Sequence, residues 1–582
     1  MIVDELARRI RQALGFTPTA EQAVAIDTFC RFMTDRDEHS ALIMRGSAGT
    51  GKTTLAAAIV KTMKALGQKV TLLAPTGRAA KVFSLNAGHA ALTIHRRIYR
   101  QKTFTGDMTG FNLNVNLTPD MLFMVDEASM IADNAPSDMA TFGTGRLLDD
   151  LISYVYNGRN CRLMLIGDKA QLPPVGEEES PALTAAVIEG YGLKVYECDL
   201  NEVLRQAAGS GILYNATVIR QMITHDEATL LPRISFSGFA DICMVPGGEL
   251  IEQLSSSYSE VGIDETIVIT RSNKRANIYN AGIRGTVLDR EEQLTTGDML
   301  MVVKNNYYWL EKEKLSEKRT VKSEKSNSFL SEKVRVKSEE SNSILSEKVK
   351  VKSEKSNSFL SEKVKVKSEK SKCDAASSPT KQMNSSLFTL HSSLKMQDSS
   401  LLTLHSSLKM QDSSLFTLNS SLKTTFLANG DRACVRRVRN VRELYGFHFA
   451  DVLLSFPDYD DYELQATVLT DTLTSDAPAL TRQQSEQLFN AVLEDYQDIP
   501  LKADRMKQIR QDMYYNALQV KYAYAVTCHK AQGGQWAHVY VDQGYMTDDM
   551  LTPDYIHWLY TAFMRATEKL FLINWPKTQT LT

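Results

Sequence analysis

Short apolar runs separated by helix-like patterns begin at residue 41 and recur through the first third of the chain. They are ALIMR from residue 41, KVTLLAP from 69, MLFMVDE from 121 and CRLMLIGD from 161. Each run has the length of a strand and lacks polar alternation, so each predicts a strand that is buried on both faces. Buried strands that alternate with helices form parallel sheets covered by helices. We therefore predict an α/β domain in this region.

A second series of apolar runs lies in the later part of the chain. It comprises TIVIT at 266–270, YAYAVT at 522–527, HVYVD at 538–542 and KLFLIN at 569–574. By the same reasoning these runs predict a second α/β domain with its own parallel sheet. The fold class expected is therefore α/β, with two similar domains.

Two repeated units separate the halves of this second series. The first is LSEKxxVKSEKSNSF, with its leucine at Leu315, Leu330, Leu345 and Leu360, and the second, SSLFTLHSSLKMQD, recurs around Leu387, Leu401 and Leu415. Repeats rich in Ser, Lys and Glu bury too little apolar surface to offset the entropy of ordering, so we predict a largely disordered insertion over 311–424. It is interpreted either as repeat expansion inside a tolerant loop or as a basic tether for nucleic acid.

Composition excludes some classes of protein. The 67 Lys and Arg residues nearly balance the 69 Asp and Glu residues, for a net charge of −2, so a nucleic-acid surface would have to be a local groove. The seven cysteines are far apart, without a CxxC pair, which argues against a zinc site or a disulfide framework. The amino terminus predicts a charged amphipathic helix rather than a signal peptide, and no apolar run approaches the roughly 20 residues that cross a bilayer. We expect a soluble, cytoplasmic protein.

A phosphate-binding loop is the strongest chemical motif. Gly46 to Thr53 match GxxxxGK[ST] and lie between a predicted strand and a predicted helix, the context that the motif requires. Backbone N–H groups of such a loop point at the β-phosphate, and the helix N-terminus adds its positive dipole end. Lys52 is expected to reach the β- and γ-phosphates, and the Thr53 hydroxyl to hold Mg²⁺. The cofactors predicted are ATP and Mg²⁺. The predicted ATP-binding residues are Gln22, Gly46, Ser47, Ala48, Gly49, Thr50, Gly51, Lys52, Thr53 and Thr54.

Two further positions complete the expected ATP site, each with an alternative. Asp126 and Glu127 follow the strand MLFMV, where an acidic pair often caps a helix. With the phosphate loop upstream, we expect Asp126 to bind Mg²⁺ and Glu127 to accept a proton from the attacking water. The Gln22 amide carries the donor and acceptor that match the N6 and N7 edge of adenine, although Thr19 and Gln22 also fit a helix capping box.

Six more motifs narrow the class of ATPase. They are APTGRAAK at 74–81, ALTIH at 91–95, GDKAQLPPVG at 167–176, LNEVLRQ at 200–206, TCHKAQG at 527–533 and YTAFMRAT at 560–567. These segments resemble the motifs of superfamily 1 helicases, in the order found in the RecD-like and Dda-like branch, superfamily 1B. The resemblance covers nearly all of the chain outside the insertion. One departure is Gln535, where RecD-like proteins often have an acidic residue.

The resemblance implies two RecA-like P-loop motor domains and assigns roles to residues of this chain. Gln171 would sense the γ-phosphate, and Arg205 and Arg565 would neutralise its charge when the cleft between the motors closes; surface salt bridges are the alternative for both arginines. The predicted catalytic residues are Glu127, Gln171, Arg205 and Arg565. The predicted DNA-binding residues are Pro75, Thr76, Arg78, Thr93, His95, Thr527, His529 and Lys530. For the threonines and histidines among them, helix capping or packing is the alternative.

Two smaller subdomains are also expected. TFTGDMTGFNLNVNL at 103–117 alternates polar and apolar residues around a Gly-Asp turn and predicts a β-hairpin. In the resembling helicases a hairpin here carries the wedge that splits the duplex, which makes Phe104 and Phe111 candidates for stacking on the fork; an ordinary surface hairpin is the alternative. MVVKNNYYWL and FLANGDRACV, on either side of the insertion, look like successive strands of an SH3-like barrel that helps to hold the strand.

The predicted domains and function follow. The domains are a first motor over 1–235 with the hairpin at about 97–119, a second motor over 236–290 and 515–582, and a barrel subdomain over 291–514 interrupted by the repeats. We predict an ATP-dependent DNA helicase that acts as a monomer on single-stranded and forked DNA, with 5′ to 3′ polarity by analogy. The alternatives are a translocase that displaces proteins without unwinding and a non-catalytic nucleic-acid-binding protein. RNA stays open as a substrate, because phosphate contacts are largely blind to base identity.

Overall fold

The computed structural model describes residues 2–47, 49–101, 111–134, 143–202, 209–224, 231–313, 427–459, 461–546 and 552–581. Those up to Glu311 and from Leu427 belong to one compact unit. The predicted insertion from residue 314 onward, Ala48, Phe104 and Arg205 lie outside the described residues. Among the described residues, no helix has both the length and the apolar character needed to cross a bilayer.

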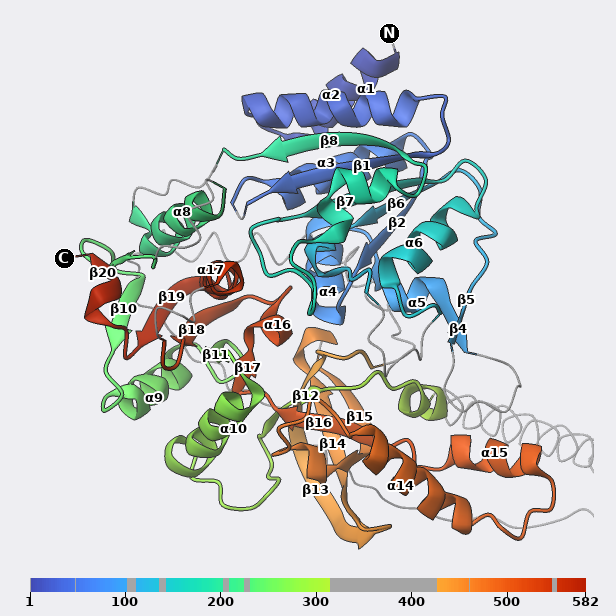
Figure 1. Cartoon of the computed structure of the whole chain (residues 1–582), viewed down its shortest axis with the longest axis vertical. Coiled ribbons are helices and arrows are strands. Elements are labelled where there is room, and N and C mark those ends of the chain that lie inside the picture. Colours follow the sequence, from blue (N-terminus) through green and yellow to red (C-terminus); the bar gives the residue numbers. More distant parts are fainter. Residues whose placement is uncertain are drawn as a thin grey trace, which may run out of the picture. The chain divides into compact units, whose positions relative to one another are not determined.

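The first sheet has six parallel strands in the order β3-β2-β6-β7-β1-β8 (Figure 1). Its strands are β1 (Ser40–Gly46), β2 (Lys69–Ala74), β3 (Ala91–Thr93), β6 (Met121–Val125), β7 (Arg162–Gly167) and β8 (Lys194–Leu200). The four predicted strands form its centre. The sequence pattern missed both edges, because β3 has three residues and β8 is half exposed, with charged residues that break the apolar run.

Helices cover both faces of this sheet, as the buried strands predicted. Side chains of β1 alternate between two hydrophobic clusters, with Leu42 and Met44 on one face and Ala41 and Ile43 on the other. The first face is covered by α1 (Ile2–Leu14), α2 (Ala20–Thr34), α3 (Lys52–Ala65) and α4 (Gly77–Ala87). The second is covered by α5 (Ile94–Ile98), α6 (Leu147–Tyr156), η2 (Pro181–Leu183) and α7 (Ala185–Glu189).

The predicted hairpin branches from the end of α5. Strands β4 (Tyr99–Gln101) and β5 (Phe111–Leu113) pair antiparallel, with Tyr99 opposite Leu113, so a hairpin is present. Its second strand lies within the predicted segment 103–117, whereas its first strand precedes that segment. Its tip lies outside the described residues.

The second sheet has five parallel strands in the order β10-β19-β18-β11-β17. They are β10 (Ile242–Val245), β11 (Thr266–Thr270), β17 (Ala525–Thr527), β18 (Trp536–Asp542) and β19 (Ala566–Ile573). The helices around it include α8 (Gly211–Thr224), α9 (Leu250–Glu260), α10 (Asn273–Gly282), α16 (Cys528–Ala531) and α17 (Pro553–Phe563). An α/β fold with two parallel sheets is therefore present, as predicted.

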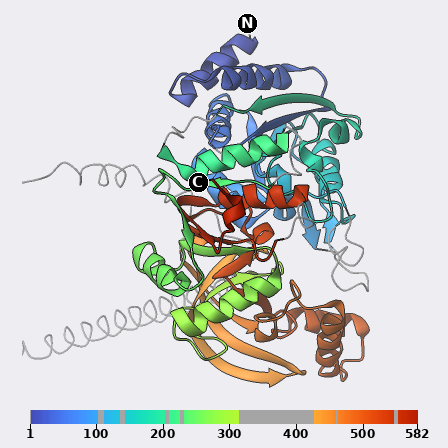
Figure 2. The same cartoon turned by 60° about the vertical axis from the view of Figure 1, so that its left-hand side comes forward.

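Along the chain, the strands of a small closed barrel lie between β11 and β17 of the second sheet. Its strands are β12 (Met299–Val302), β13 (Arg432–Leu444), β14 (Phe447–Phe456), β15 (Tyr462–Leu469) and β16 (Leu518–Tyr522). Helices α14 (Arg482–Glu494) and α15 (Lys502–Gln511) pack against its β13–β14 hairpin through a separate apolar cluster, and both views place them beside that hairpin (Figures 1 and 2).

The barrel corrects three details of the sequence interpretation. β12 and β13 are neighbours, with Met299 opposite Cys434, but β12 ends at Val302, and residues 308–313 are helical rather than extended. The Trp309 indole N–H donates to the Asn516 carbonyl at 2.9 Å, which holds that turn in place. The run YAYAVT is not one strand, because β16 ends at Tyr522 in the barrel and β17 starts at Ala525 in the second sheet. The barrel therefore extends beyond residue 514.

Candidate nucleotide and nucleic-acid site

The order of the first sheet brings three predicted motifs together. β6, β7 and β1 are neighbours, and Arg45 is level with Gly167 across the β1–β7 pair. Parallel strands end at the same edge, so the phosphate loop after β1, the acidic pair after β6 and the GDKAQ segment after β7 share the carboxyl edge of the sheet. A Cβ on Gly167 would lie 3.1 Å from the Ser129 nitrogen. The segment after β6 and the segment after β7 therefore pack closely against each other.

Backbone geometry explains the glycines of the phosphate loop. A Cβ on Gly46 would lie 2.7 Å from the Leu200 carbonyl oxygen and 2.9 Å from Thr50 Oγ1. Gly49 and Gly51 have φ of 81° and 84°, in the left-handed region that L side chains rarely adopt. The sequence from Gly46 to Gly51 therefore permits a tight loop directly before α3.

The polar side chains of this loop turn inward. Lys52 Nζ donates to the carbonyls of Gly46 and Ser47 at 2.6 and 2.8 Å, and Thr50 Oγ1 donates to the Ser47 carbonyl at 2.8 Å. Ser47 Oγ is buried and has no hydrogen-bond partner among the described residues. Thr53 is half-buried and Thr54 exposed in the first turn of α3. An ammonium folded over a concave loop beside an unpaired hydroxyl is an arrangement that a phosphate group can engage.

Gln22 joins the helix before β1 to the phosphate loop. Thr19 and Gln22 form the capping box that the sequence offered as an alternative, because Thr19 Oγ1 accepts from the Gln22 nitrogen and Gln22 Oε1 accepts from the Thr19 nitrogen. Gln22 Nε2 also donates to the Thr50 carbonyl at 3.1 Å. The buried amide is thus engaged at both ends, and adenine recognition by Gln22 stays a prediction.

Asp126 and Glu127 lie at the end of β6. Asp126 Oδ1 accepts from the Glu127 nitrogen at 2.9 Å. Burial and the charge of Glu127 raise the pKa of Asp126, whereas the charge of Lys52 lowers it, so the ammonium acts on this carboxyl. Glu127 has φ of 53° and makes no side-chain capping bond to the short helix that follows, so the capping alternative is wrong for this residue.

Gln171 meets Arg565 of the second α/β domain. Arg565 is 3 % exposed and donates to Gln171 Oε1 at 3.3 Å, as well as to the carbonyls of Thr561 and Gly534 at 3.0 and 3.1 Å. The surface salt-bridge alternative is therefore wrong for Arg565. Four more hydrogen bonds link the GDKAQL segment to the second domain. They join Tyr560 to Asp168 (2.7 Å), His557 to the Ala170 carbonyl (2.9 Å), the Leu172 nitrogen to Thr561 (2.8 Å) and Gln532 to the Leu172 carbonyl (2.9 Å).

The APTGRAA segment is also in contact with the second domain. Arg78 donates to the Gln535 carbonyl at 2.6 Å and lies 4.4 Å from the centre of the Trp536 ring, and its guanidinium is 3.6 Å from Asp458 of the barrel. Because Gln535 contributes only its main-chain carbonyl, its departure from the acidic residue of the relatives does not affect this contact. The sequence interpretation missed Trp536 and Asp458, which lie in no motif.

The remaining DNA-binding candidates fall into two groups. Thr76 and Thr93 cap α4 and α5, accepting from the nitrogens of Ala79 and Arg96 at 3.2 and 3.3 Å, which is the capping alternative. Burial lowers the pKa of His95 to about 4, so its ring is neutral at pH 7. In contrast, the half-buried Thr527 makes no side-chain capping bond, although it precedes α16.

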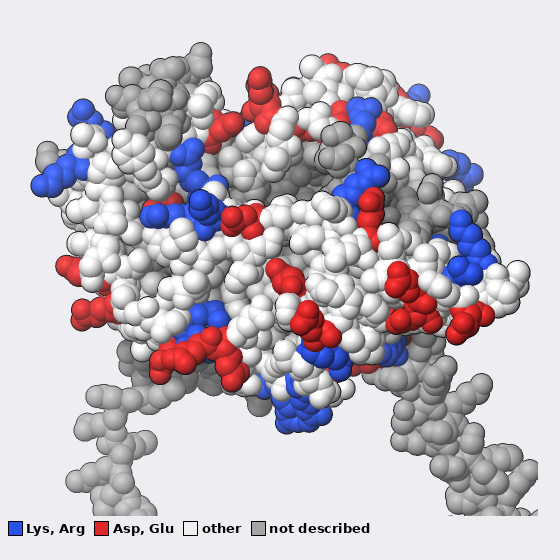
Figure 3. Space-filling view, turned by 60° about the horizontal axis from the view of Figure 1, so that its bottom comes forward, with Lys and Arg blue, Asp and Glu red and all other residues white. Residues whose placement is uncertain are grey.

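Lys530 and His529 lie on the short helix α16 that Thr527 precedes. His529 is exposed and Lys530 half-buried. Burial and the neighbouring charge of Lys521 lower the pKa of Lys530 to about 8. Pro75 is half-buried at the end of β2. On the face that Figure 3 presents, Lys and Arg side chains are interspersed with Asp and Glu side chains.

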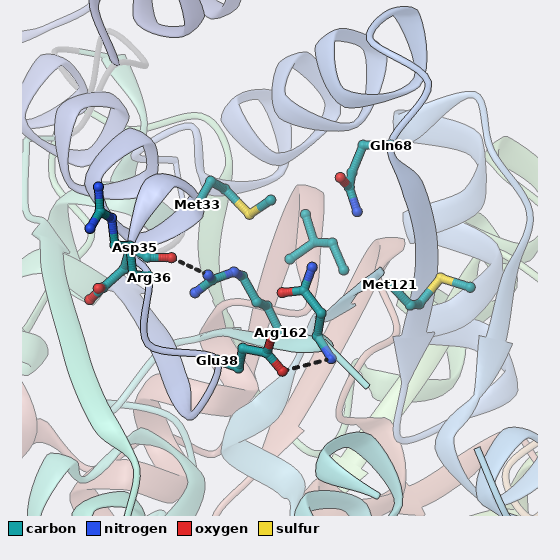
Figure 4. A pocket seen from close by; sticks show the side chains of 9 residues that line it. Met33, Asp35, Arg36, Glu38, Gln68, Met121 and Arg162 are labelled. Carbon is teal, nitrogen blue, oxygen red and sulfur yellow. Dashed lines mark hydrogen bonds between the residues drawn. The ribbon is translucent and has the colours of Figure 1, made fainter. Parts of the chain in front are cut away.

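A cavity of about 350 Å³ lies at the opposite edge of the first sheet, beside the amino-terminal ends of β6 and β7 (Figure 4). The Arg162 guanidinium at its side donates to the Asp35 carbonyl at 2.5 Å and to Ser40 Oγ at 2.6 Å. Its charge thus anchors the turn between α2 and β1. The cavity is separate from the phosphate loop, which follows the carboxyl end of β1.

Comparisons with known proteins match two parts of the chain. Residues 17–221 match the AAA domain family, and residues 522–573 match the UvrD-like helicase C-terminal domain family. The ATP-dependent RecD2 DNA helicase of Deinococcus radiodurans is 32 % identical over 179 residues, which are 31 % of this chain and 21 % of that protein. The ATP-dependent DNA helicase dda of Enterobacteria phage T4 is 24 % identical over 291 residues, 49 % of this chain and 60 % of that protein.

Solved structures of Pif1 helicases are also similar to this chain. The structure from Bacteroides with ADP-AlF3 and single-stranded DNA has a TM-score of 0.39 at 13 % identity, with 97 % of this chain and 95 % of that chain covered. The chain spans about a fifth of the length of the RecD2 relative. The matches to an AAA domain and to a UvrD-like helicase C-terminal domain, in this order along the chain, agree with its resemblance to superfamily 1B helicases.

Proposed function

We propose that this protein is an ATP-dependent DNA helicase with two RecA-like motors that moves 5′ to 3′ along single-stranded DNA and separates a duplex ahead of it. The first motor comprises residues 1–235. The second comprises 236–290 and the chain after β16, and the barrel between them is an SH3-like subdomain. The matched AAA and UvrD-like domains support this proposal, and the polarity rests on the family analogy.

The contact between Gln171 and Arg565 carries the proposal. Gln171 follows a strand that adjoins the strand of the phosphate loop, and Arg565 comes from the other domain. An arginine that reaches the nucleotide side of the first domain can stabilise charge on the γ-phosphate only while the two domains are close. Hydrolysis would therefore be coupled to their separation, which is what a motor requires.

The residues around the phosphate loop fit a magnesium nucleotide. Thr53 and Asp126 offer the oxygen donors that Mg²⁺ prefers and would hold it, and the bound ion would neutralise charge on the phosphates. Lys52 would leave the loop carbonyls for the β- and γ-phosphates. Glu127 would orient the attacking water and accept its proton.

The proposed DNA track runs along the carboxyl edges of both sheets. Thr527, His529 and Lys530 supply donors there, and Thr76 and Arg78 lie next to the second domain. Gly533 packs on this track, since a Cβ there would lie 3.0 Å from Ala79 Cβ and 3.2 Å from Thr76 Oγ1. The β4–β5 hairpin is proposed as the wedge at the fork.

The test combines ATP hydrolysis with unwinding. We expect hydrolysis to be stimulated by single-stranded DNA, and a forked duplex with a 5′ tail to be unwound in preference to one with a 3′ tail. Lys52→Ala should remove both activities. Stimulated hydrolysis that displaces streptavidin from a strand but opens neither fork would favour the translocase, and the absence of any stimulated hydrolysis would favour a non-catalytic binding protein. Parallel reactions with RNA would decide the substrate.

A further inference from the structure

A turn of the barrel lies against the APTGRAAK segment of the first domain. It is the short helix η5 (Pro457–Tyr459), which connects β14 to β15, and we refer to it as the barrel turn. The Arg78 guanidinium lies 3.6 Å from the Asp458 carboxylate, and Lys81 Nζ donates to the Pro457 carbonyl at 3.1 Å. Both basic residues of the segment are therefore in contact with the barrel turn.

The same turn lies against the first residue of α4. A Cβ on Gly77 would lie 2.5 Å from the Tyr459 hydroxyl and closer still to Asp431 Oδ1, so the two surfaces leave no room for a side chain. The Tyr459 hydroxyl donates to Asp431 Oδ1 at 2.8 Å. A helix N-terminus favours anions, phosphate groups among them, because its first N–H groups and its dipole are positive. At α4, barrel side chains already lie beside this helix end.

Asp458 acts on cations of two domains. Its side chain is 17 % exposed and that of Arg78 is 15 % exposed, so water screens this ion pair only in part. Burial and the charge of Arg78 lower the pKa of Arg432, in β13, to about 10, whereas the charge of Asp458 raises it. Asp458 therefore offsets the repulsion between the two guanidinium groups, one from each side of the contact.

The contact is nevertheless incomplete. The 3.6 Å between Arg78 Nη1 and Asp458 Oδ1 is longer than a hydrogen bond. Arg78 Nη1 and Asp458 Oδ2 are buried without a hydrogen-bond partner among the described residues, and so are Nε and Nη2 of Arg432. Buried polar atoms are normally paired. A phosphate group can accept two hydrogen bonds from one guanidinium, so it can replace a carboxylate that accepts none.

We propose that the barrel turn is an autoinhibitory contact, in which the Asp458 carboxylate holds the Arg78 guanidinium until a phosphodiester group of a single strand takes its place. This inference rests on the proposed function, in which Arg78 belongs to the DNA track, and adds an internal competitor to that track. The measured affinity for a strand is then the intrinsic affinity reduced by the fraction of molecules in which the turn is released. Strand binding and release of the barrel turn from α4 are coupled.

The first test is the Asp458→Asn variant, which removes the charge and keeps the size of the side chain. Binding of a fluorescent oligo(dT) is measured by anisotropy without nucleotide. We expect the affinity to rise about 5-fold, the upper end of the contribution of a partly exposed ion pair. Arg78 and Arg432 would repel each other without the carboxylate, which also favours release. Damage to the fold would lower the affinity, so it cannot produce this gain.

Asp461→Asn is the matched control. Asp461 lies in the same connection between β14 and β15, but its carboxylate accepts from Ser455 Oγ at 3.1 Å and lies 3.7 Å from Arg436. The variant makes the same change in net charge and should bind oligo(dT) as the unaltered chain does. An equal gain in both variants would mean that only the overall charge matters, and would overturn the inference.

Hydrogen exchange on the unaltered chain is an independent measurement. Amides in peptides that contain Asp458 and Tyr459 should exchange faster when oligo(dT) is bound, because the strand releases the turn. Unchanged or slower exchange would show that the strand binds while the turn stays in place, which contradicts the proposal.

The two proposals can fail separately. If the unaltered chain binds oligo(dT) and hydrolyses ATP in response, while Asp458→Asn binds with the same or lower affinity, the proposed function stands and the autoinhibitory contact is refuted. If neither protein binds an oligonucleotide, both proposals are refuted.

Discussion

Replacement of Arg565 tests the coupling of the two domains most directly. Its buried guanidinium donates to Thr561, Gly534 and Gln171, and of these three bonds only the one to Gln171, at 3.3 Å, reaches the first domain. Arg565→Ala therefore removes a positive charge and one link between the domains. The other two bonds hold the local backbone of the second domain.

The structure sets the size of each effect. We expect the kcat of DNA-stimulated ATP hydrolysis to fall about 10³-fold, the lower end of the effect of an arginine on phosphoryl transfer, because Lys52 stays in place. The backbone carbonyls left without a donor would each lower the free energy of unfolding by about 1–3 kcal/mol. Arg565→Lys keeps the charge but lacks the fork that reaches three acceptors, so its kcat should be intermediate.

A double-mutant cycle with Gln171→Ala is the decisive assay. A hydrogen bond to a charged group contributes about 1.5 kcal/mol. The kcat of the double variant should therefore be about 10-fold higher than the product of the two single effects would give. Steady-state hydrolysis with saturating oligo(dT) measures all four proteins. Full turnover in Arg565→Ala would refute the reasoning, and so would single effects that simply multiply, because independent residues transmit nothing between the domains.

Three other changes have outcomes that the structure predicts. Lys52→Ala should reduce DNA-stimulated hydrolysis to background while single-strand binding by anisotropy remains; unchanged turnover would contradict the phosphate-loop assignment. Gly46→Ala places a Cβ 2.7 Å from the Leu200 carbonyl, so the free energy of unfolding in urea should fall by about 1–3 kcal/mol, and an unaltered midpoint would show that the loop can shift. Burial raises the pKa of Asp431 to about 7, so the folded state binds this proton more tightly than the unfolded state does. The contribution of Asp431 to the free energy of unfolding is therefore present at acidic pH and is lost as pH rises from its unfolded pKa through about 7. Asp431→Asn should make the Tm less dependent on pH over that range, and parallel curves would argue against a protonated Asp431.

Local signals in the sequence were sufficient to predict the central strands of each sheet and the phosphate-binding loop. Continuous apolar runs specified the buried strands because a strand covered on both faces has no polar alternation, as in β6 and β7. The glycines around Lys52 are required by backbone geometry within a few residues. A local motif nevertheless left the role of the Gln22 side chain ambiguous, because the amide that closes a capping box also donates a hydrogen bond to the phosphate loop.

Tertiary structure decided everything that depends on partners far apart along the chain. The apolar run YAYAVT gave no indication that β16 closes a barrel while β17 joins a sheet, because an apolar pattern records burial and not the neighbouring strand. Arg565 was assigned from its motif, but its bond to Gln171 joins residues 394 positions apart. Lys521 belongs to no motif, and only the folded barrel brings it beside α10 and Lys530. Periodicity and loop chemistry act over a few residues, whereas the geometry between domains results from the packing of the whole chain.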